Sequence, residues 1–227
     1  MAAKPTLFQR SLVEAVGTFF LVFIGAGAVI AAQYAGLGGS GLIVVAFANG
    51  IALALAVTFA MNISGGHINP AISIAMALTK RIKALDAAVY IAAQLIGGII
   101  AGLLLVAIYP QSAGIAVHYG SPVLGQSISV LQGIALEAVM TFILAFTVFG
   151  TIVDGRATRI AGFGPGLAVF IDVLAGGALT GAAMNPVRAM GPMIAAGFFS
   201  NWYVYWIGPV AGAIIAAILY AAIAQKR

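Results

Sequence analysis

The chain lacks cysteine altogether and carries very little charge. Only 7% of its 227 residues are charged, whereas a typical soluble domain has about 25%. The absence of cysteine excludes disulfides, a thiolate nucleophile and a thiolate metal site. No nucleophile–base pair and no cluster of metal-ligating residues is evident, so we expect no catalytic residue, no metal and no cofactor. The chain is instead 63% hydrophobic, which predicts an all-α protein that crosses a membrane several times.

Six apolar segments reach the length of about 20 residues that a membrane-spanning helix requires. They cover approximately residues 10–32, 41–61, 85–108, 129–151, 159–179 and 202–224. A glycine-rich turn at 33–40 and an uncharged loop at 109–126 separate some of them. We expect the first segment to serve as the signal for membrane insertion.

The basic residues predict the orientation of these helices. Cytoplasmic loops of membrane proteins collect Lys and Arg. Nine of the ten basic residues lie on one face if all six segments span and both termini are cytoplasmic: Lys4, Arg10, Lys80, Arg81, Lys83, Arg156, Arg159, Lys226 and Arg227. Membrane topology therefore explains the net charge of +5 better than nucleic-acid binding does, because the basic residues are scattered along the chain.

Two further apolar stretches, at about 69–79 and 185–196, are too short to span. A helix of this length measures about 17 Å, whereas the hydrocarbon core is about 30 Å thick. The loop charges place the two stretches on opposite sides of the membrane. They are therefore predicted to be half-helices that enter from opposite faces, with their irregular backbone shielded by the protein.

The chain contains an internal repeat. The segment LVEAVGTFFLVFIGAGAV (12–29) aligns with ALEAVMTFILAFTVFGTI (135–152), which pairs Glu14 with Glu137, and SGGHINPAI aligns with TGAAMNPVR. Three spans per half mean that the second copy is inserted upside down. We therefore interpret residues 1–227 as one domain built from inverted repeats at about 8–112 and 129–226, with the functional site near the bilayer midplane.

Each repeat places an Asn-Pro pair at the start of its half-helix. Asparagine is a favoured N-cap, and proline suits the first helical turn. Asn69 with Pro70 and Ala71, and Asn185 with Pro186 and Val187, are thus predicted to start two half-helices near the midplane. Each helix N-terminus carries roughly half a positive charge, and both would face one axis.

These features together resemble the aquaporin, or major intrinsic protein, family over essentially the whole chain. The resemblance is carried by the paired glutamates, by SGGHINPA and MNPVRAMGP, and by WYVYWIGPVAG at 202–212. It implies a right-handed bundle of six spans and two half-helices, with a pore in each protomer and a homotetrameric assembly in the lipid bilayer. It also implies that Asn69 and Asn185 meet in the pore, orient a central water and so interrupt a proton wire, while the helix ends oppose cations.

The same resemblance assigns a selectivity filter to Asn49, Val173, Ala182 and Arg188. A buried Arg costs about 2.5–3.5 kcal/mol on insertion scales, so within a membrane it is a functional candidate. Strict water channels carry an aromatic residue and a histidine at the first two filter positions, so the filter here is expected to be wider. The region is most similar to tonoplast-type and related microbial members, which implies passage of water and of small neutral solutes such as ammonia or urea.

Several residues keep two interpretations each. Glu14 and Glu137 are predicted to hold the backbone before each half-helix, and a proton relay is the alternative. His67 either lines the pore or pins its turn. Val187, where the family usually has Ala, either narrows the central constriction or packs against the facing half-helix. Asp172 and His118 receive no role.

The main functional interpretation is a passive channel for water and small uncharged solutes that excludes protons and ions. A channel chiefly for ammonia, urea, glycerol or another small neutral solute is the alternative. A proton-coupled secondary transporter shares the inverted repeat, but it needs coupling carboxylates in the pathway. A membrane adhesion protein is a third class, which the paired Asn-Pro motifs and Arg188 disfavour.

Overall fold

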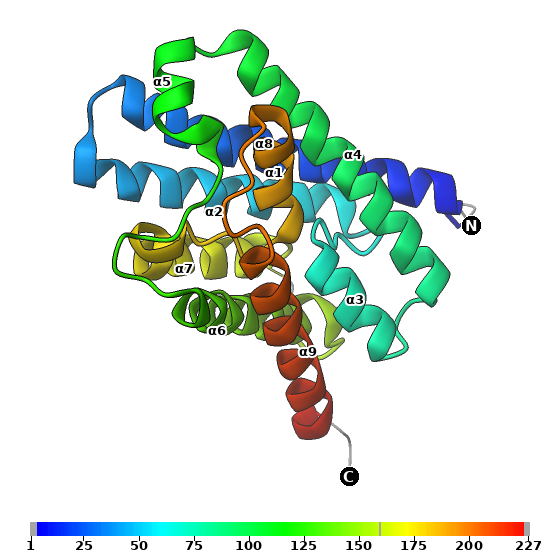
Figure 1. Ribbon diagram of the computed structural model, residues 1–227. Coiled ribbons are helices and arrows are strands. Elements are labelled where there is room, and N and C mark those ends of the chain that lie inside the picture. Colours follow the sequence, from blue (N-terminus) through cyan, green and yellow to red (C-terminus); the bar gives the residue numbers. More distant parts are fainter. Residues whose placement is uncertain (1–3, 159, 225–227) are drawn as a thin grey trace.

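The computed structural model describes residues 4–158 and 160–224, and that part of the chain is helical with no strand. Six helices are long and apolar enough to span a membrane: α1 (Leu7–Tyr34), α2 (Gly41–Ala60), α4 (Ala84–Ile108), α6 (Val130–Val148), α7 (Phe163–Thr180) and α9 (Val204–Ala224). Figure 1 shows them as one bundle around two shorter helices. The predicted fold class is confirmed, and the predicted bounds differ from these by a few residues.

The half-helices are α3 (Pro70–Leu78) and α8 (Pro186–Ala196). Each begins with its asparagine as N-cap in extended backbone and with proline at the first helical position. With 9 and 11 residues they are about 14 and 17 Å long. Neither can cross the bilayer, so each starts inside the protein, at its buried asparagine.

The two repeats also share their capping. Thr6 caps α1 and Ser129 caps α6, and each forms a reciprocal capping box with a glutamine three residues later. These boxes satisfy backbone N–H groups that would otherwise be unpaired at the helix start. Equivalent helices of the two repeats therefore start with the same local chemistry.

Small residues set the close packing between helices. A Cβ added at Gly97 would lie 2.1 Å from the Ala15 carbonyl oxygen, and one added at Gly212 would lie 2.0 Å from the Ala138 carbonyl oxygen. The two glycines therefore let α4 pack closely on α1 and α9 pack closely on α6. Small residues commonly permit such close approach between helices in membranes. The outward faces carry large exposed apolar side chains such as Leu131 and Phe8.

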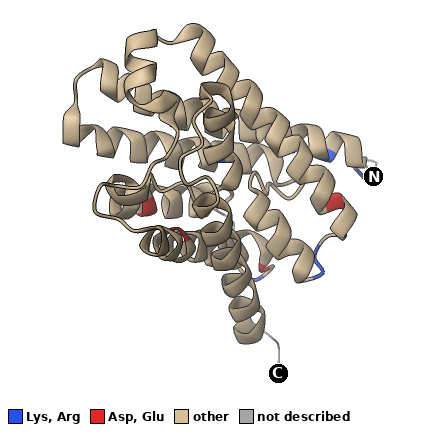
Figure 2. Ribbon diagram, in the orientation of Figure 1, with Lys and Arg blue, Asp and Glu red and all other residues tan. Residues whose placement is uncertain are grey.

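Charged residues are sparse, and most lie at helix ends. Figure 2 shows Lys and Arg near the N-terminus and in the loop between α3 and α4, with most of the bundle uncharged. Arg159, Lys226 and Arg227, three of the predicted same-side basic residues, lie outside the described residues.

Two regions contain short helical elements that the sequence did not predict. The predicted loop at 109–126 contains a short helix, α5 (Gln111–Ala116), and a 3₁₀ turn, η2 (His118–Gly120). The predicted span at 129–151 ends in a π-helical turn, η3 (Phe149–Val153). Sequence periodicity does not reveal such short elements, because they are set by tertiary contacts rather than by a repeated apolar pattern.

Candidate functional site

The two motif asparagines bind each other's turns at the centre of the bundle. The Asn69 side-chain amide donates a hydrogen bond to the Met184 carbonyl at 2.9 Å, and the Asn185 amide donates to the Ile68 carbonyl at 2.7 Å. Each acceptor directly precedes the other motif. This reciprocal pair of hydrogen bonds joins the N-termini of α3 and α8 although the motifs are more than 100 residues apart in the chain.

Each asparagine also caps its own helix. The Asn69 Oδ1 accepts from the Ala71 N–H at 2.8 Å, and the Asn185 Oδ1 accepts from the Val187 N–H at 3.0 Å. An amide group has two N–H donors, so one donor on each side chain remains beyond the cross-link. Both side chains line the central cavity, where these donors can meet a polar molecule.

Glu14 holds the turn before α3. Its carboxylate accepts from the backbone N–H groups of His67 and Ile68 at 2.9 and 2.6 Å, from the Ser64 hydroxyl at 2.6 Å and from the Gln94 amide at 2.8 Å. The residue is fully buried. Buried polar groups are costly unless they are hydrogen-bonded, and four donors here satisfy the carboxylate while fixing the turn.

Glu137 does the same for the turn before α8. It accepts from the N–H groups of Ala183 and Met184 at 3.0 and 2.7 Å and from the Thr180 hydroxyl at 2.7 Å. Met184, like Ile68 in the first turn, has a positive φ that a non-glycine residue rarely adopts. The carboxylates thus stabilise two unusual turns that direct backbone and asparagine groups toward the centre.

A matched tyrosine pair, which the sequence interpretation did not assign, supports the same turns. The Tyr90 hydroxyl donates to the Ser64 carbonyl at 3.0 Å, and the Tyr205 hydroxyl donates to the Thr180 carbonyl at 2.8 Å. Both rings are fully buried. The repeat contains the signal that identifies them, since Tyr90 and Tyr205 are separated by nearly the same interval as Asn69 and Asn185.

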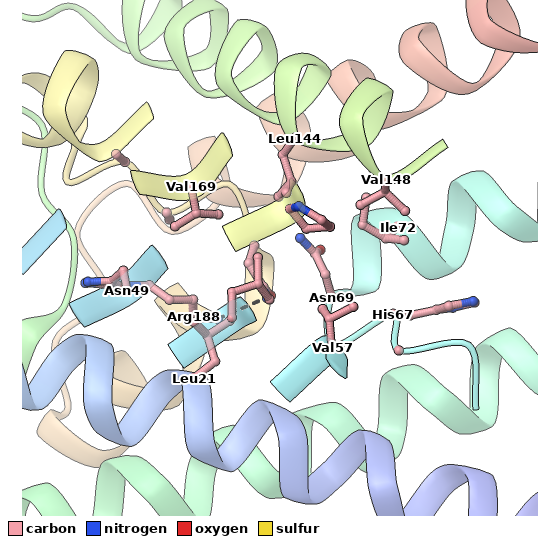
Figure 3. Close-up of a pocket in the computed structure, with 16 residues that line it drawn as sticks. Leu21, Asn49, Val57, His67, Asn69, Ile72, Leu144, Val148, Val169 and Arg188 are labelled. Atoms are coloured by element: carbon pink, nitrogen blue, oxygen red, sulfur yellow. Dashed lines mark hydrogen bonds between the residues drawn. The ribbon is translucent and has the colours of Figure 1, made fainter. Parts of the chain in front are cut away.

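A narrow central cavity contains the two asparagines. Its walls are apolar on several sides, with Leu53, Ile72 and Val169 among the lining residues (Figure 3). The volume open to water is about 20 Å³, and a single water needs about 10–15 Å³ on that measure. The cavity therefore has room for one water molecule, or at most two.

A larger chamber adjoins each end of this cavity. One chamber, of about 530 Å³, shares Arg188 with the central cavity; we call it the Arg188 chamber. The other, of about 610 Å³, shares His67 with it, and we call it the His67 chamber. Arg188 and His67 therefore mark the two places where the narrow central cavity lies next to a larger chamber.

Arg188 is held by a backbone carbonyl rather than by a carboxylate. It is 4% exposed, and its Nη1 donates to the Gly120 carbonyl at 2.8 Å. Three consecutive left-handed residues, His118, Tyr119 and Gly120, turn that carbonyl toward it. The Arg188 Nε is buried and has no hydrogen-bond partner among the described residues, which is uncommon for a buried donor.

The other predicted filter residues lie near Arg188, where the central cavity adjoins the Arg188 chamber; we call this place the junction. Asn49 and Ala182 line the central cavity, and Val173 lines the Arg188 chamber. The Asn49 amide does not reach across the opening: its Nδ2 donates to the Val45 carbonyl on its own helix at 2.8 Å, and Figure 3 shows it pointing away from Arg188.

Gly25 on α1 makes room for the Asn49 side chain. A Cβ added there would lie 2.2 Å from the Asn49 Oδ1. The asparagine therefore lies flat against α1, and the junction stays open on this side.

His67 is both a lining residue and a fixed one. It contacts the central cavity and the His67 chamber, its Nδ1 lies 3.1 Å from the Ser73 hydroxyl, and its ring packs edge-on against Tyr90. The second repeat has Ala183 and Ala189 at the positions equivalent to His67 and Ser73, so this polar contact has no counterpart there.

Val187 packs against helices that the two interpretations from sequence did not consider. It is fully buried against Val22 and Ala101, and its Cγ1 occupies the space where Gly98 lacks a side chain. Val187 does not appear among the residues that line the central cavity. The extra methyl groups fill a contact with α4 and α1.

Asp172 and His118 occupy different environments. Asp172 is 2% exposed, its Oδ2 has no hydrogen-bond partner among the described residues, and nothing in the structure explains its charge. His118 stacks on Phe198 with ring centroids 3.7 Å apart and lines the Arg188 chamber. Within the described ranges, no group of three or more His, Asp or Glu side chains is placed to hold a metal ion.

Similarity to known proteins agrees with this geometry. The family model described as major intrinsic protein matches residues 1–220. Aquaporin TIP4-4 from Zea mays is 42% identical over 226 residues, covering 96% of this chain and 88% of that protein. Probable aquaporin TIP3-2 from Arabidopsis thaliana is 37% identical over 231 residues, with 96% and 85% coverage.

A solved structure shares the fold. The X-ray structure of the aquaglyceroporin from Plasmodium falciparum superposes with a TM-score of 0.84 over 95% of this chain and 96% of that one, at 24% sequence identity. Its likeness concerns the arrangement of helices, whereas the family match concerns the sequence itself. Because that match covers nearly all of the chain and full-length relatives reach 42% identity, the chain belongs to the major intrinsic protein family.

Proposed function

We propose that this protein is a passive channel for water that also passes small uncharged solutes and excludes protons and ions. The observation that carries the proposal is the row of three neighbouring spaces that share Arg188 and His67, narrowest where the N-termini of two opposed half-helices meet. We infer that the three spaces connect into one path. Aquaporin relatives over the full length support the same function. A conformational cycle or a bound cofactor is not needed for passive flow along such a path.

Proton exclusion follows from the paired donors. Asn69 and Asn185 each keep one N–H for the cavity, and each helix N-terminus adds roughly half a positive charge. A central water that accepts both hydrogen bonds must turn its oxygen toward them and its hydrogens away. The waters on either side then point in opposite directions, which breaks the chain of hydrogen bonds along which a proton would move.

Ions are excluded for two reasons. The apolar walls of the central cavity offer few groups to replace an ion's hydration shell, and removing that shell costs many kcal/mol. The helix ends and Arg188 add a positive field that opposes cations. A neutral molecule of the size of water has no charge to be repelled by this field and loses a much weaker hydration shell than an ion does. Uncharged permeants are therefore favoured.

The filter that we propose consists of Arg188 with Asn49, Val173 and Ala182. Arg188 supplies the donors, and the other three are smaller than an aromatic or histidine side chain and leave space. Because Asn49 lies against Gly25 rather than across the opening, we infer that ammonia and urea can also pass. Glu14 and Glu137 serve as supports of the turns in this proposal, because their oxygens are occupied by backbone and side-chain donors.

We further propose that the protein assembles as a homotetramer with one pore per protomer and with both termini in the cytoplasm. The orientation rests on the basic residues, which concentrate on one side. The absence of cysteine makes a direct test simple. Single variants Lys83→Cys and Gly39→Cys should react with a membrane-impermeant thiol reagent from opposite sides of sealed right-side-out vesicles, and labelling of both from the same side would contradict the topology.

Stopped-flow light scattering on proteoliposomes tests the function. Water flux without any ion gradient is expected, together with measurable urea and ammonia flux and no proton leak. Flux that requires a proton or sodium gradient would replace the channel with a secondary transporter, and no flux at all would favour an adhesion role. If solute flux greatly exceeded water flux, the alternative solute channel would be the better description.

Two variants test the filter. Asn49→Phe with Val173→His should narrow the junction and reduce urea flux while water flux persists. Arg188→Ala should raise urea flux or admit protons. An unchanged selectivity profile in both would refute the filter assignment while leaving the channel itself intact.

A further inference from the structure

An open pocket outside the central cavity and its two chambers lies where α1, α3 and α4 meet at one end of the bundle, beside the His67 chamber. It has a volume of about 550 Å³ and is lined by Arg10, Lys80, Arg81, Lys83 and Asp86, together with Ala77, Ile82 and Ala84. This volume is within the range of about 300–1,000 Å³ that is typical of small-molecule sites. We call it the basic pocket, and the water pathway makes no use of most of its residues.

The charge of the basic pocket is strongly unbalanced. Asp86 is its single acidic lining residue within the described ranges, and it already forms an ion pair with Arg10 at 3.1 Å. Lys80, Arg81 and Lys83 are exposed and take part in no ion pair within those ranges. Three positive charges therefore face the pocket without a countercharge.

Backbone hydrogen bonds fix the turn that carries these basic residues. After α3, the Lys80 N–H donates to the Ala77 carbonyl at 3.0 Å and the Arg81 N–H donates to the Met76 carbonyl at 2.9 Å. This closed turn leads in three residues to the start of α4. The N-cap of α4 is Lys83, whose side chain makes no capping hydrogen bond, so the first N–H groups of α4 add positive potential to the same place.

The surroundings of the pocket indicate a lipid rather than a soluble anion. It lies at the ends of the spanning helices α1 and α4, where the chain enters the hydrocarbon region. Phe8, Leu78 and Leu85, at positions next to the basic side chains, are 76%, 59% and 70% exposed. Basic residues at the membrane surface combined with exposed apolar side chains suit a molecule with an anionic head and acyl chains.

We propose that the basic pocket binds the phosphate-containing headgroup of an anionic phospholipid in the leaflet that faces the α3–α4 loop. Lys80 and Lys83 bind the phosphate oxygens, and the acyl chains lie along the exposed apolar residues of α1, α3 and α4. The site is independent of the channel function, since neither lysine lines the central cavity or its chambers.

Arg81 connects this pocket with the water pathway. It also lines the His67 chamber and lies over the Phe149 ring at 5.5 Å. A bound headgroup therefore lies beside the mouth of that chamber. Arg81 is left unchanged in the binding test, because a substitution there would alter both the basic pocket and the His67 chamber.

The test measures binding of fluorescent phosphatidylglycerol to the purified protein in neutral detergent micelles. Unlabelled phosphatidylglycerol should compete, whereas phosphatidylcholine should compete poorly. Each basic residue near the surface contributes roughly a fivefold change in affinity. Lys80→Gln and Lys83→Gln should each weaken binding about fivefold and the double variant about 25-fold, while the matched control Lys4→Gln, outside the pocket, changes it less than about twofold.

Three outcomes would overturn the proposal. Wild-type affinity in the double variant would exclude the site, an equal loss in Lys4→Gln would indicate diffuse attraction to the whole surface, and equally strong competition by free glycerol phosphate would identify a soluble phosphoester instead. Water flux of the double variant in phosphatidylcholine vesicles should equal that of the wild type. That control shows that the protein is folded, and it separates failure of the lipid site from failure of the channel.

Discussion

Val187 stands directly after the second Asn-Pro pair, and the structure predicts that it contributes to stability rather than to permeation. Val187→Ala removes two methyl groups from a fully buried contact with Val22, Ala101 and Gly98. In a membrane the loss is one of packing, since lipid solvates methyl groups as well as the protein does. The cavity cost is about 1–2 kcal/mol, which lowers the melting temperature by roughly 2–4 °C per kcal/mol for a chain of this size.

Gly98 is the partner in a double-mutant cycle. A Cβ added at Gly98 would lie 2.3 Å from the Val187 Cγ1, and overpacking of this kind costs about 1–3 kcal/mol. Alanine recovers up to about 1 kcal/mol through its better helix propensity. Once Val187 is alanine, the next contacts of that Cβ are ordinary, at 3.4 and 3.6 Å. The double variant should therefore lie within about 1 kcal/mol of the wild type.

The assay combines thermal unfolding in detergent with stopped-flow water flux. Both single variants should melt below the wild type, the double variant should largely recover, and water flux per folded protein should not change in any of them. Additive destabilisation would show that the two side chains do not share a contact. A rise in flux for Val187→Ala would show that the valine narrows the path, and would refute the reasoning.

Three further predictions concern single sites. Glu137→Gln places an amide N–H against a backbone N–H and should cost about 1–3 kcal/mol; unchanged thermal stability would exclude a supporting role. Gly25→Ala should push the Asn49 side chain into the cavity and lower water flux, and a further Asn49→Ala change should restore it; unchanged flux in Gly25→Ala would contradict this. Hydrogen bonds from Arg156 hold the pKa of Asp154 well below its usual range, so the carboxylate contributes stability above about pH 3.9 and loses it only at lower pH. Amide exchange of residues 152–157, corrected for intrinsic rates, should thus be equal at pH 8 and pH 5 and faster in Asp154→Asn, and a change between those pH values would refute it.

The architecture was largely predictable because its determinants are local. Apolar length identifies spanning helices, and an asparagine followed by proline identifies the start of a short one. The repeat then implies that Asn69 and Asn185 occupy equivalent places. These signals depend on residues close together in the chain or on a comparison of the chain with itself.

The details at the junction were not predictable, because they depend on contacts between segments that are far apart in the chain. The carbonyl that binds Arg188 belongs to Gly120, and its direction depends on left-handed backbone at His118 and Tyr119, which no local pattern indicates. The direction of Asn49 depends on the missing side chain of Gly25 on another helix. Such contacts join distant segments, and a single sequence carries no signal of the pairing.

The proposed filter lies where the two repeats depart from internal symmetry. Both half-helices have the same asparagine cap and a carboxylate that holds the preceding turn, so the proposed proton barrier at the centre is symmetric. The repeat interval that pairs Asn69 with Asn185 also pairs Ile72 with Arg188. Both side chains line the central cavity, one of them apolar and one charged. A molecule in a single-file path must pass every section in turn, so one charged constriction is sufficient to select it. Under the proposed filter, a second arginine in place of Ile72 would add a barrier without adding discrimination.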